Sequence, residues 1–204
     1  MMPLMNGLEL CAKIKNNIEY SHIPVILLTA KVLPEAKVEG FSYGADAYVE
    51  KPFTILQLHM QIRNLLKLRT TFQQHMTSFL PDAKPEEKEE EETGIQLTPQ
   101  DQEFIKKTQE IIEQQLADEG FSIDTLASEM NMSRSNFYRK LKALSGMPPN
   151  DYLKNCRLNK AAQLLKEGYR VTEVFERTGF GSSSYFAKCF KAKFGVLPKD
   201  YISN

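Results

Sequence analysis

The 204-residue chain contains no tryptophan and three cysteines, Cys11, Cys156 and Cys189, without CxxC or Cys/His spacing. An odd number of isolated cysteines argues against a disulfide or zinc framework and favours small core residues. The sequence also lacks an apolar run of the roughly 18 residues that a membrane-spanning helix needs, and its N-terminus lacks the pattern of a secretory signal. These absences predict a cytoplasmic protein, with no membrane contact in this segment.

Sequence motifs of catalysis are missing as well. The histidines, His22, His59 and His75, all lie in the first part of the chain. None belongs to an HExxH motif, and the chain has neither a nucleophile elbow nor a phosphate-binding glycine loop. We therefore expect no enzymatic activity, no catalytic residues and no metal site.

Charge is balanced overall but not along the chain. The sequence holds 26 basic and 26 acidic side chains, yet residues 131–204 hold 14 basic and 5 acidic ones. Residues 81–100 show the opposite bias, with 2 basic and 7 acidic side chains. A basic stretch of this kind indicates contact with a polyanion.

The first unit, residues 1–80, alternates predicted helices with apolar strands. Helices are expected at 7–16, 34–43 and 54–68, and strands at 23–30 and 47–53. This alternation indicates an α/β fold with a parallel sheet. Two parallel strands do not form a stable sheet alone, so we expect Ile26, Leu28 and Val49 to be exposed unless another chain completes the sheet. Residues 1–70 should therefore be poorly stable as a monomer, pair with another copy, or aggregate.

Residues 81–97 are predicted to be an acidic, disordered linker. The stretch PDAKPEEKEEEETG combines two prolines with a dense acidic run and almost no apolar side chains. A solvated spacer is the simplest interpretation, and the alternative is that residues 86–92 fold back onto the basic region as a DNA mimic. Deletion of residues 81–94 separates the two, because only the second alternative predicts tighter DNA binding after deletion.

The second unit, residues 98–204, is predicted to be all-α and to contain a duplicated helix pair. FSIDTLASEMNMSRSNFYRKLKALSG returns about 49 residues later as VTEVFERTGFGSSSYFAKCFKAKFG. Each copy has a capping serine, a turn residue suited to left-handed backbone and an apolar stripe, which together predict a helix-turn-helix motif. Residues 149–166 form a predicted connecting helix of roughly 27 Å, comparable to the ~34 Å repeat of successive major grooves.

The outer face of the second helix in each copy carries the candidate DNA-binding side chains. They are Arg134, Ser135, Asn136, Tyr138, Arg139 and Lys142 in the first copy, and Ser182, Ser183, Ser184, Lys188 and Lys191 in the second. Arginine suits guanine edges and lysine suits phosphate. The alternative, a protein-interaction module whose basic helices bind an acidic partner, stays open at this point.

Residues 98–204 resemble the DNA-binding domain of the AraC/XylS family of transcription regulators. The stretches NMSRSNFYRKLKALSGMPPNDYL and TGFGSSSYFAKCFKAKFGVLPKDY are similar to its two motif signatures. The resemblance implies a seven-helix domain whose two recognition helices enter adjacent major grooves of double-stranded DNA. Two residues depart from the family pattern: Phe175 replaces a small residue, and Asn131 replaces the usual turn glycine.

Residues 1–80 resemble the second half of a response-regulator receiver domain, on the stretches MMPLMNG, ILLTA and AYVEKPF. The resemblance implies a truncated doubly wound domain with Thr29, Tyr48 and Lys51 as switch residues, a Lys51-Pro52 bond that is often cis, and a dimerisation surface at residues 34–69. The phosphate-accepting aspartate and the magnesium-binding acids belong to the other half of that domain. We therefore expect no cofactor, an incomplete magnesium site, no phosphoryl acceptance and a possible homodimer.

A receiver followed by an AraC-type domain resembles the C-terminal end of hybrid two-component regulators. The expected function is therefore that of a sequence-specific DNA-binding transcription regulator at the output end of a phosphorelay. The operator and the input signal do not follow from these residues.

Overall fold

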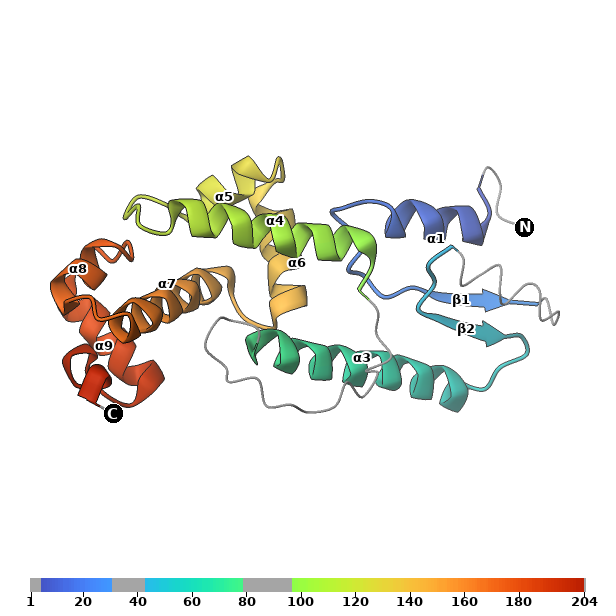
Figure 1. The fold of residues 1–204 in the computed structure, drawn as a ribbon. Coiled ribbons are helices and arrows are strands. Elements are labelled where there is room, and N and C mark those ends of the chain that lie inside the picture. Colours follow the sequence, from blue (N-terminus) through green and yellow to red (C-terminus); the bar gives the residue numbers. More distant parts are fainter. Residues whose placement is uncertain (1–4, 31–42, 79–96, 204) are drawn as a thin grey trace. The chain divides into compact units, whose positions relative to one another are not determined.

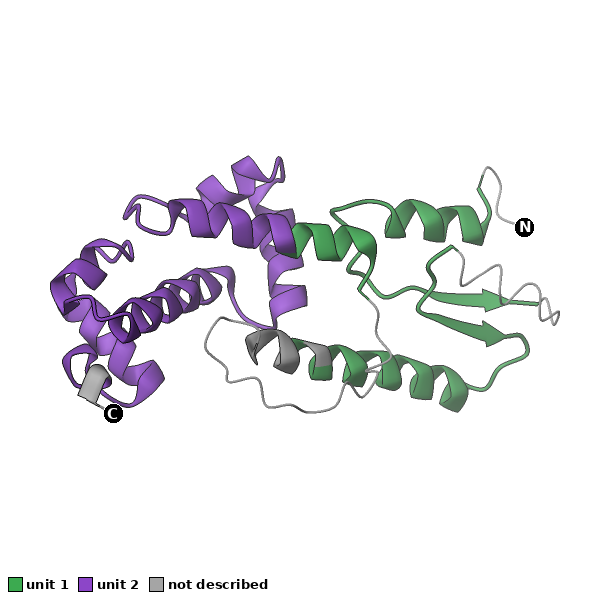
Figure 2. Ribbon diagram, in the orientation of Figure 1, with its two compact units in different colours: residues 1–74, 90–105 green, residues 75–89, 106–204 purple. Residues whose placement is uncertain are grey.

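A computed structural model describes residues 5–30, 43–78 and 97–203, and the chain divides into two compact units (Figures 1 and 2). The first unit comprises residues 1–74 and 90–105, and the second comprises residues 75–89 and 106–204. The division falls inside helix α4 (Pro99–Gln115), whose residues 99–105 are grouped with the first unit. The domain boundaries at residues 80 and 97 stay predictions, and the predicted linker lies almost entirely outside the described residues.

The first unit contains the predicted alternation of helices and strands. Its elements are α1 (Gly7–Lys15), β1 (Ile26–Thr29), β2 (Ala47–Glu50) and α3 (Ile55–Ser78). The two strands pair in parallel, with Ile26 opposite Ala47 and Thr29 opposite Glu50, which confirms the predicted parallel sheet. Helix α3 continues past its predicted end at residue 68, because neither glycine nor proline interrupts the sequence there. The helix predicted at 34–43 lies largely outside the described residues.

A buried ion pair ties helix α1 to the loops that precede both strands. Lys15 is 5% exposed, and its ammonium lies 2.5 Å from the Asp46 carboxylate. The same ammonium donates hydrogen bonds to the carbonyl oxygens of Ser21 and Ile23, at 3.3 and 2.9 Å. Asp46 in turn accepts a 2.6 Å bond from the backbone N–H of Val25. Since each partner is satisfied by the other and by backbone groups, the burial of this lysine is compensated.

Apolar surface remains exposed on the first unit, although not at every predicted position. Leu28 is 43% exposed and Ile26 is partly buried, whereas Val49 is only 7% exposed, so the prediction for Val49 is wrong. Val49 and Ala47, which are alternate residues on one face of β2, are both buried, although Leu28, which pairs with Val49, remains exposed on the neighbouring strand. Among the described side chains of α3, the most exposed apolar one is Ile55, at 84%.

The second unit is helical throughout its described residues, as predicted. After α4 it contains α5 (Ile123–Glu129), α6 (Arg134–Ser145), α7 (Pro149–Lys166), α8 (Val171–Glu176), α9 (Ser183–Phe194) and the 3₁₀ helix η1 (Pro198–Ser203). Helix α7 has the predicted bounds. Helices α5 and α6 lie near one end of α7, and α8 and α9 lie near its other end (Figure 1).

Each helix pair has its own core. Around the first pair and the end of α4, the buried side chains are mainly aliphatic, with the rings of Phe121 and Phe137 among them; the aliphatic members include Ile112, Leu116, Ile123, Leu126, Leu141 and Leu144. The second is strongly aromatic and comprises Leu158, Ala161, Ala162, Leu164, Leu165, Val174, Phe180, Phe186 and Phe190. Among the described residues, no helix is long and apolar enough to cross a membrane.

Candidate nucleic-acid interface

The first helix pair is shaped by caps and by one left-handed residue. Ser122 accepts a hydrogen bond from the Thr125 N–H at the start of α5, and Ser133 accepts one from the Asn136 N–H at the start of α6, both at 3.3 Å. Between the helices, Asn131 adopts a φ of 53°. Asparagine tolerates this conformation better than most residues, which explains how it replaces glycine in the turn. The predicted caps and turn residue of this motif are thereby confirmed.

The predicted face of α6 is accessible, and several of its side chains already interact with each other. Arg134, Ser135, Arg139 and Lys142 are exposed, and Asn136 and Tyr138 are partly buried. The Arg139 guanidinium donates to the Asn136 side-chain oxygen and, at 3.4 Å, to the Ser135 carbonyl oxygen. The planar donor fork of Arg139 is therefore held in place by its own helix before any DNA binds.

An ion pair within the motif constrains Arg134. Its Nε lies 2.9 Å from an oxygen of Asp124, which belongs to the first turn of α5. Both side chains are largely exposed, at 74% and 57%, so the pair contributes little to stability. Any ligand of Arg134 must therefore compete with the Asp124 carboxylate for the donors of the guanidinium.

Lys140 differs from the other basic residues of α6. It is 0% exposed, on the inner face of the helix together with Phe137 and Leu141. A count of basic residues along the chain treats this ammonium as surface charge, which overestimates the positive charge available to a polyanion. Sequence reasoning missed this because lysine is mostly exposed in proteins, and only the packing of α6 against its neighbours shows that position 140 is buried.

The second helix pair repeats the backbone design with different chemistry. Gly179 occupies the turn with a φ of 64°, and Ser182 accepts a 3.4 Å hydrogen bond from the Tyr185 N–H at the start of α9. Helix α9 ends at Gly195, with a φ of 80°, just as α6 ends at Gly146, with a φ of 76°. The predicted correspondence between the two copies is therefore visible in the backbone.

The predicted face of α9 is exposed, and it includes one side chain that sequence reasoning missed. Ser182, Ser183, Ser184, Lys188 and Lys191 are all exposed. Tyr185 is 53% exposed on the same helix, and its hydrogen bond with the Cys189 sulfur raises its pKa, so the phenol is neutral at neutral pH. The 49-residue repeat could have found it, because Tyr185 corresponds to Asn136.

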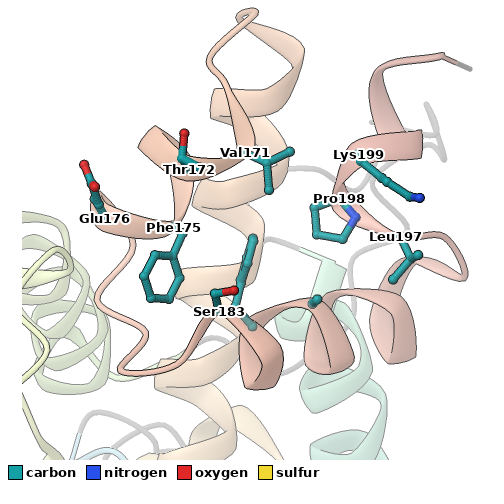
Figure 3. A pocket seen from close by; sticks show the side chains of 10 residues that line it. Val171, Thr172, Phe175, Glu176, Ser183, Leu197, Pro198 and Lys199 are labelled. Carbon is teal, nitrogen blue, oxygen red and sulfur yellow. The ribbon is translucent and has the colours of Figure 1, made fainter.

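Phe175 lines a hollow beside the second motif. Its ring lies 6.2 Å from that of Phe186, centroid to centroid, and it is partly buried. Together with Val171, Leu197 and Ser183 it borders a cavity of about 310 Å³ between α8, α9 and η1 (Figure 3). The large ring is therefore accommodated at the edge of the helix pair, where a small residue would leave more open space.

Both recognition helices are anchored to α7. Lys193, from α9, donates to the carbonyl oxygen of Asn155 at 3.3 Å and to the side-chain oxygen of Asn159. Asn155 also donates to the sulfur of Met147, in the loop between α6 and α7.

Burial raises the pKa of the Cys156 thiol, on α7, to about 12, so this cysteine stays protonated. The three cysteines are free. Cys11 is fully buried, as predicted for a core residue, whereas Cys156 and Cys189 are only partly buried.

The predicted switch residues of the first unit lie close together on the sheet. Thr29 ends β1, and the Lys51 N–H donates a 2.7 Å bond to the Thr29 carbonyl oxygen. Tyr48 pairs with Leu27, so the register places Thr29 and Tyr48 on one face of the sheet. The Lys51-Pro52 peptide bond is cis, as the resemblance implies. Within the described residues, no three His, Cys, Asp or Glu side chains are grouped as a metal site requires.

Two family models match the chain. Residues 1–63 match the response regulator receiver domain, and residues 126–204 match a helix-turn-helix domain. These matches agree with the two resemblances drawn from the sequence motifs.

Similar proteins cover the same two parts. The chain is 35% identical to "Histidine kinase P4" from Formosa agariphila over 202 residues, which are 98% of this chain and 14% of that protein. Two solved structures, each 30% identical, are the C-terminal domain of the two-component response regulator yesN from Fusobacterium nucleatum and the DNA-binding domain of AdpA in complex with a target DNA. They cover 49% and 48% of this chain, and 98% and 89% of their own, with TM-scores of 0.46 and 0.45.

Proposed function

We propose that this chain is a sequence-specific transcription regulator whose two recognition helices enter adjacent major grooves. Its matches to the receiver-domain model and to a helix-turn-helix model support the proposal. The observation that carries the proposal is the pair of capped helices, α6 and α9, each with an exposed polar face and each tied to the 18-residue helix α7. At 1.5 Å per residue α7 spans roughly 27 Å. That length suits two helices that contact one side of a duplex about one turn apart.

The first motif supplies the main base contacts in this proposal. Arg139 bridges the O6 and N7 atoms of a guanine, since its fork is already oriented by Asn136 and Ser135. Arg134 contacts a second guanine or a phosphate, once it exchanges Asp124 for DNA. Tyr138 and Lys142 flank these contacts, and Lys142 neutralises a phosphate.

The second motif supplies most of the backbone contacts. Lys188 and Lys191 neutralise phosphates, and the serines 182–184 at the start of α9 place hydroxyl and backbone donors near a further phosphate. Tyr185 adds an exposed ring whose hydroxyl can donate to DNA. The proposal therefore assigns sequence selection mainly to α6 and register along the duplex mainly to α9.

The first unit acts as the receiver part of a phosphorelay protein in this proposal. Thr29, Tyr48 and Lys51 are its switch residues, and residues 34–69 form a homodimer surface. The chain covers 14% of the kinase from F. agariphila, and the similarity to that protein supports a place for this chain within a longer signalling protein. Its position at the output end and its location in the cytoplasm are part of the proposal. No catalytic step is part of the proposal.

A selection from a random duplex pool tests the DNA-binding function. The full chain should enrich two short motifs about one helical turn apart, and binding of the selected duplex should weaken steeply with salt. Weak binding that does not depend on sequence would contradict the proposal. Preferential binding to acidic peptides over the selected duplex would instead support the alternative of a protein-interaction module.

A further inference from the structure

The turn of the second motif lies directly against the loop that leads into the first motif. Gly179 has almost no free space, because a Cβ atom there would collide with the carbonyl oxygen of Leu116, at the end of α4. Two residues further on, the side chain of Glu119 fills the space beside Gly181. Residues 116–121 therefore touch both helix-turn-helix motifs, since they precede α5 and contact the turn before α9.

One arginine of α7 joins these same segments. The Nη2 atom of Arg157 donates to the carbonyl oxygens of Asp118 and Phe121, at 2.8 and 3.2 Å. The Nε and Nη2 atoms each lie 3.1 Å from the position a Cβ would take on Gly179. A single guanidinium thus sits between the loop before α5 and the turn before α9.

The surroundings of Arg157 show that its position is closely defined. Its Nε is buried and, within the described part of the chain, has no hydrogen-bond partner. Burial lowers the pKa of the guanidinium, and the nearby Asp118 and Glu119 act in the opposite direction. A planar cation that donates to two backbone carbonyls has few alternative positions, because any movement would leave more of its donors unsatisfied.

The DNA sets a strict requirement on this part of the molecule. One base pair advances the duplex by about 3.4 Å and rotates it by about 35°, so two grooves can be read together only when the two recognition helices keep a fixed separation and angle. Helix α7 fixes the distance between its ends. It does not by itself fix the rotation of one motif relative to the other, and the contact among residues 116–121, Arg157 and Gly179 can do so.

We propose that Arg157 is a positioning residue that holds the two motifs at one relative orientation and thereby sets the spacing between the two half-sites that the protein accepts. The inference rests on the proposed function. It goes beyond the proposed function because it assigns specificity for half-site spacing to a side chain of α7, which lies outside the candidate DNA-binding faces of α6 and α9.

The test uses the full chain and a series of duplexes with changed spacing. The selected duplex is compared with versions whose spacer is one or two base pairs shorter or longer. In the wild type the selected spacing should be strongly preferred, and in R157Q that preference should fall by about three- to ten-fold, a typical range for loss of coupling between sites. R157K keeps the charge, but its ammonium ends one bond short of the position of Nη2, which donates to both carbonyl oxygens, so it should lose most of the preference as well.

Matched controls separate this role from charge and from folding. K160Q removes an exposed cation from the same helix without touching residues 116–121, and it should keep the wild-type spacing preference. Affinity for a duplex with only the first half-site should stay near the wild-type value in R157Q, which shows that the first motif remains folded. An unchanged spacing preference in R157Q would overturn this inference alone. No spacing preference in the wild type would overturn the proposed two-groove function together with it.

Discussion

The two helix-turn-helix motifs of this protein share a backbone and differ in surface chemistry. Both begin their recognition helix at a capping serine, turn at a residue with positive φ, and end at a left-handed glycine. The face of α6 presents two arginines and an asparagine, whereas the face of α9 presents serines, a tyrosine and lysines. In the proposed function, the shared backbone geometry places both helices against DNA, and the side chains decide whether a motif selects bases or holds phosphates.

The cores of the two motifs also differ, in the number of aromatic side chains that they contain. The first motif buries Phe121 and Phe137 among aliphatic side chains, and the second brings the rings of Phe186, Phe190, Phe194 and Tyr201 close together. Phe190 lies 4.5 Å from Phe194 and 5.2 Å from Tyr201, centroid to centroid. Removing one ring from this cluster therefore deprives several neighbours of contacts at once.

The largest expected effect concerns that aromatic core. Phe190→Ala should lower the free energy of unfolding of the second motif by about 3–5 kcal/mol, because the ring is 0% exposed and its loss leaves a cavity. Urea denaturation followed by far-ultraviolet circular dichroism measures the change. Leu144→Ala, in the first motif, is the matched core truncation. A loss below about 1 kcal/mol for Phe190→Ala would show that the aromatic cluster does not stabilise the motif as described.

The next effect concerns base selection by α6. Arg139→Ala should weaken binding to the selected duplex by about 1–3 kcal/mol, which is roughly 5- to 150-fold, and should relax specificity at one base pair. Fluorescence anisotropy with the selected duplex and with single-base variants measures both quantities. If Arg139→Ala weakened all duplexes equally, the assignment of Arg139 as a base reader would be wrong.

The matching change in α9 should behave differently. Lys188→Ala should weaken binding to all duplexes by a similar factor and reduce the slope of log affinity against log salt by about 1, since it removes one phosphate contact. Salt titration of the selected and a scrambled duplex measures the slope. Loss of specificity at one base pair would contradict the division of labour between the two motifs.

The smallest effect concerns the ion pair beside Arg134. Asp124→Asn should change the free energy of unfolding by less than about 1 kcal/mol, because both partners are mostly exposed. It should tighten DNA binding by a few-fold, since Arg134 then has no competing carboxylate. Glu129→Gln, which removes a carboxylate at the other end of α5, is the control. Weaker binding in Asp124→Asn would indicate that Asp124 orients Arg134 rather than competing with DNA.

Local chemistry was sufficient to predict much of this fold. The serine caps, the turn at Asn131, the bounds of α7 and the parallel strand pair all follow from short-range preferences or from hydrophobic periodicity. The candidate DNA-binding residues were also predicted to be accessible, and nine of the eleven are exposed, while Asn136 and Tyr138 are partly buried.

The remaining features depend on contacts between distant segments. Lys140 is buried and Arg157 bridges two loops, although both look like ordinary surface charges in the sequence. The Arg134–Asp124 pair joins two helices across a turn, and no local preference encodes it. Val49 was expected to be exposed, yet it packs inward. Which face of an element is buried depends on the elements packed against it, and periodicity alone does not determine that.

The claim that one chain reads two adjacent major grooves is tested most directly by inserting base pairs between the two half-sites of the selected duplex. Five inserted base pairs, about half a helical turn, place the half-sites on opposite sides of the duplex. The affinity of the wild-type chain for this duplex should then fall to its affinity for a duplex that contains the first half-site alone. An affinity that the insertion leaves unchanged would contradict the claim that one chain reads two adjacent major grooves.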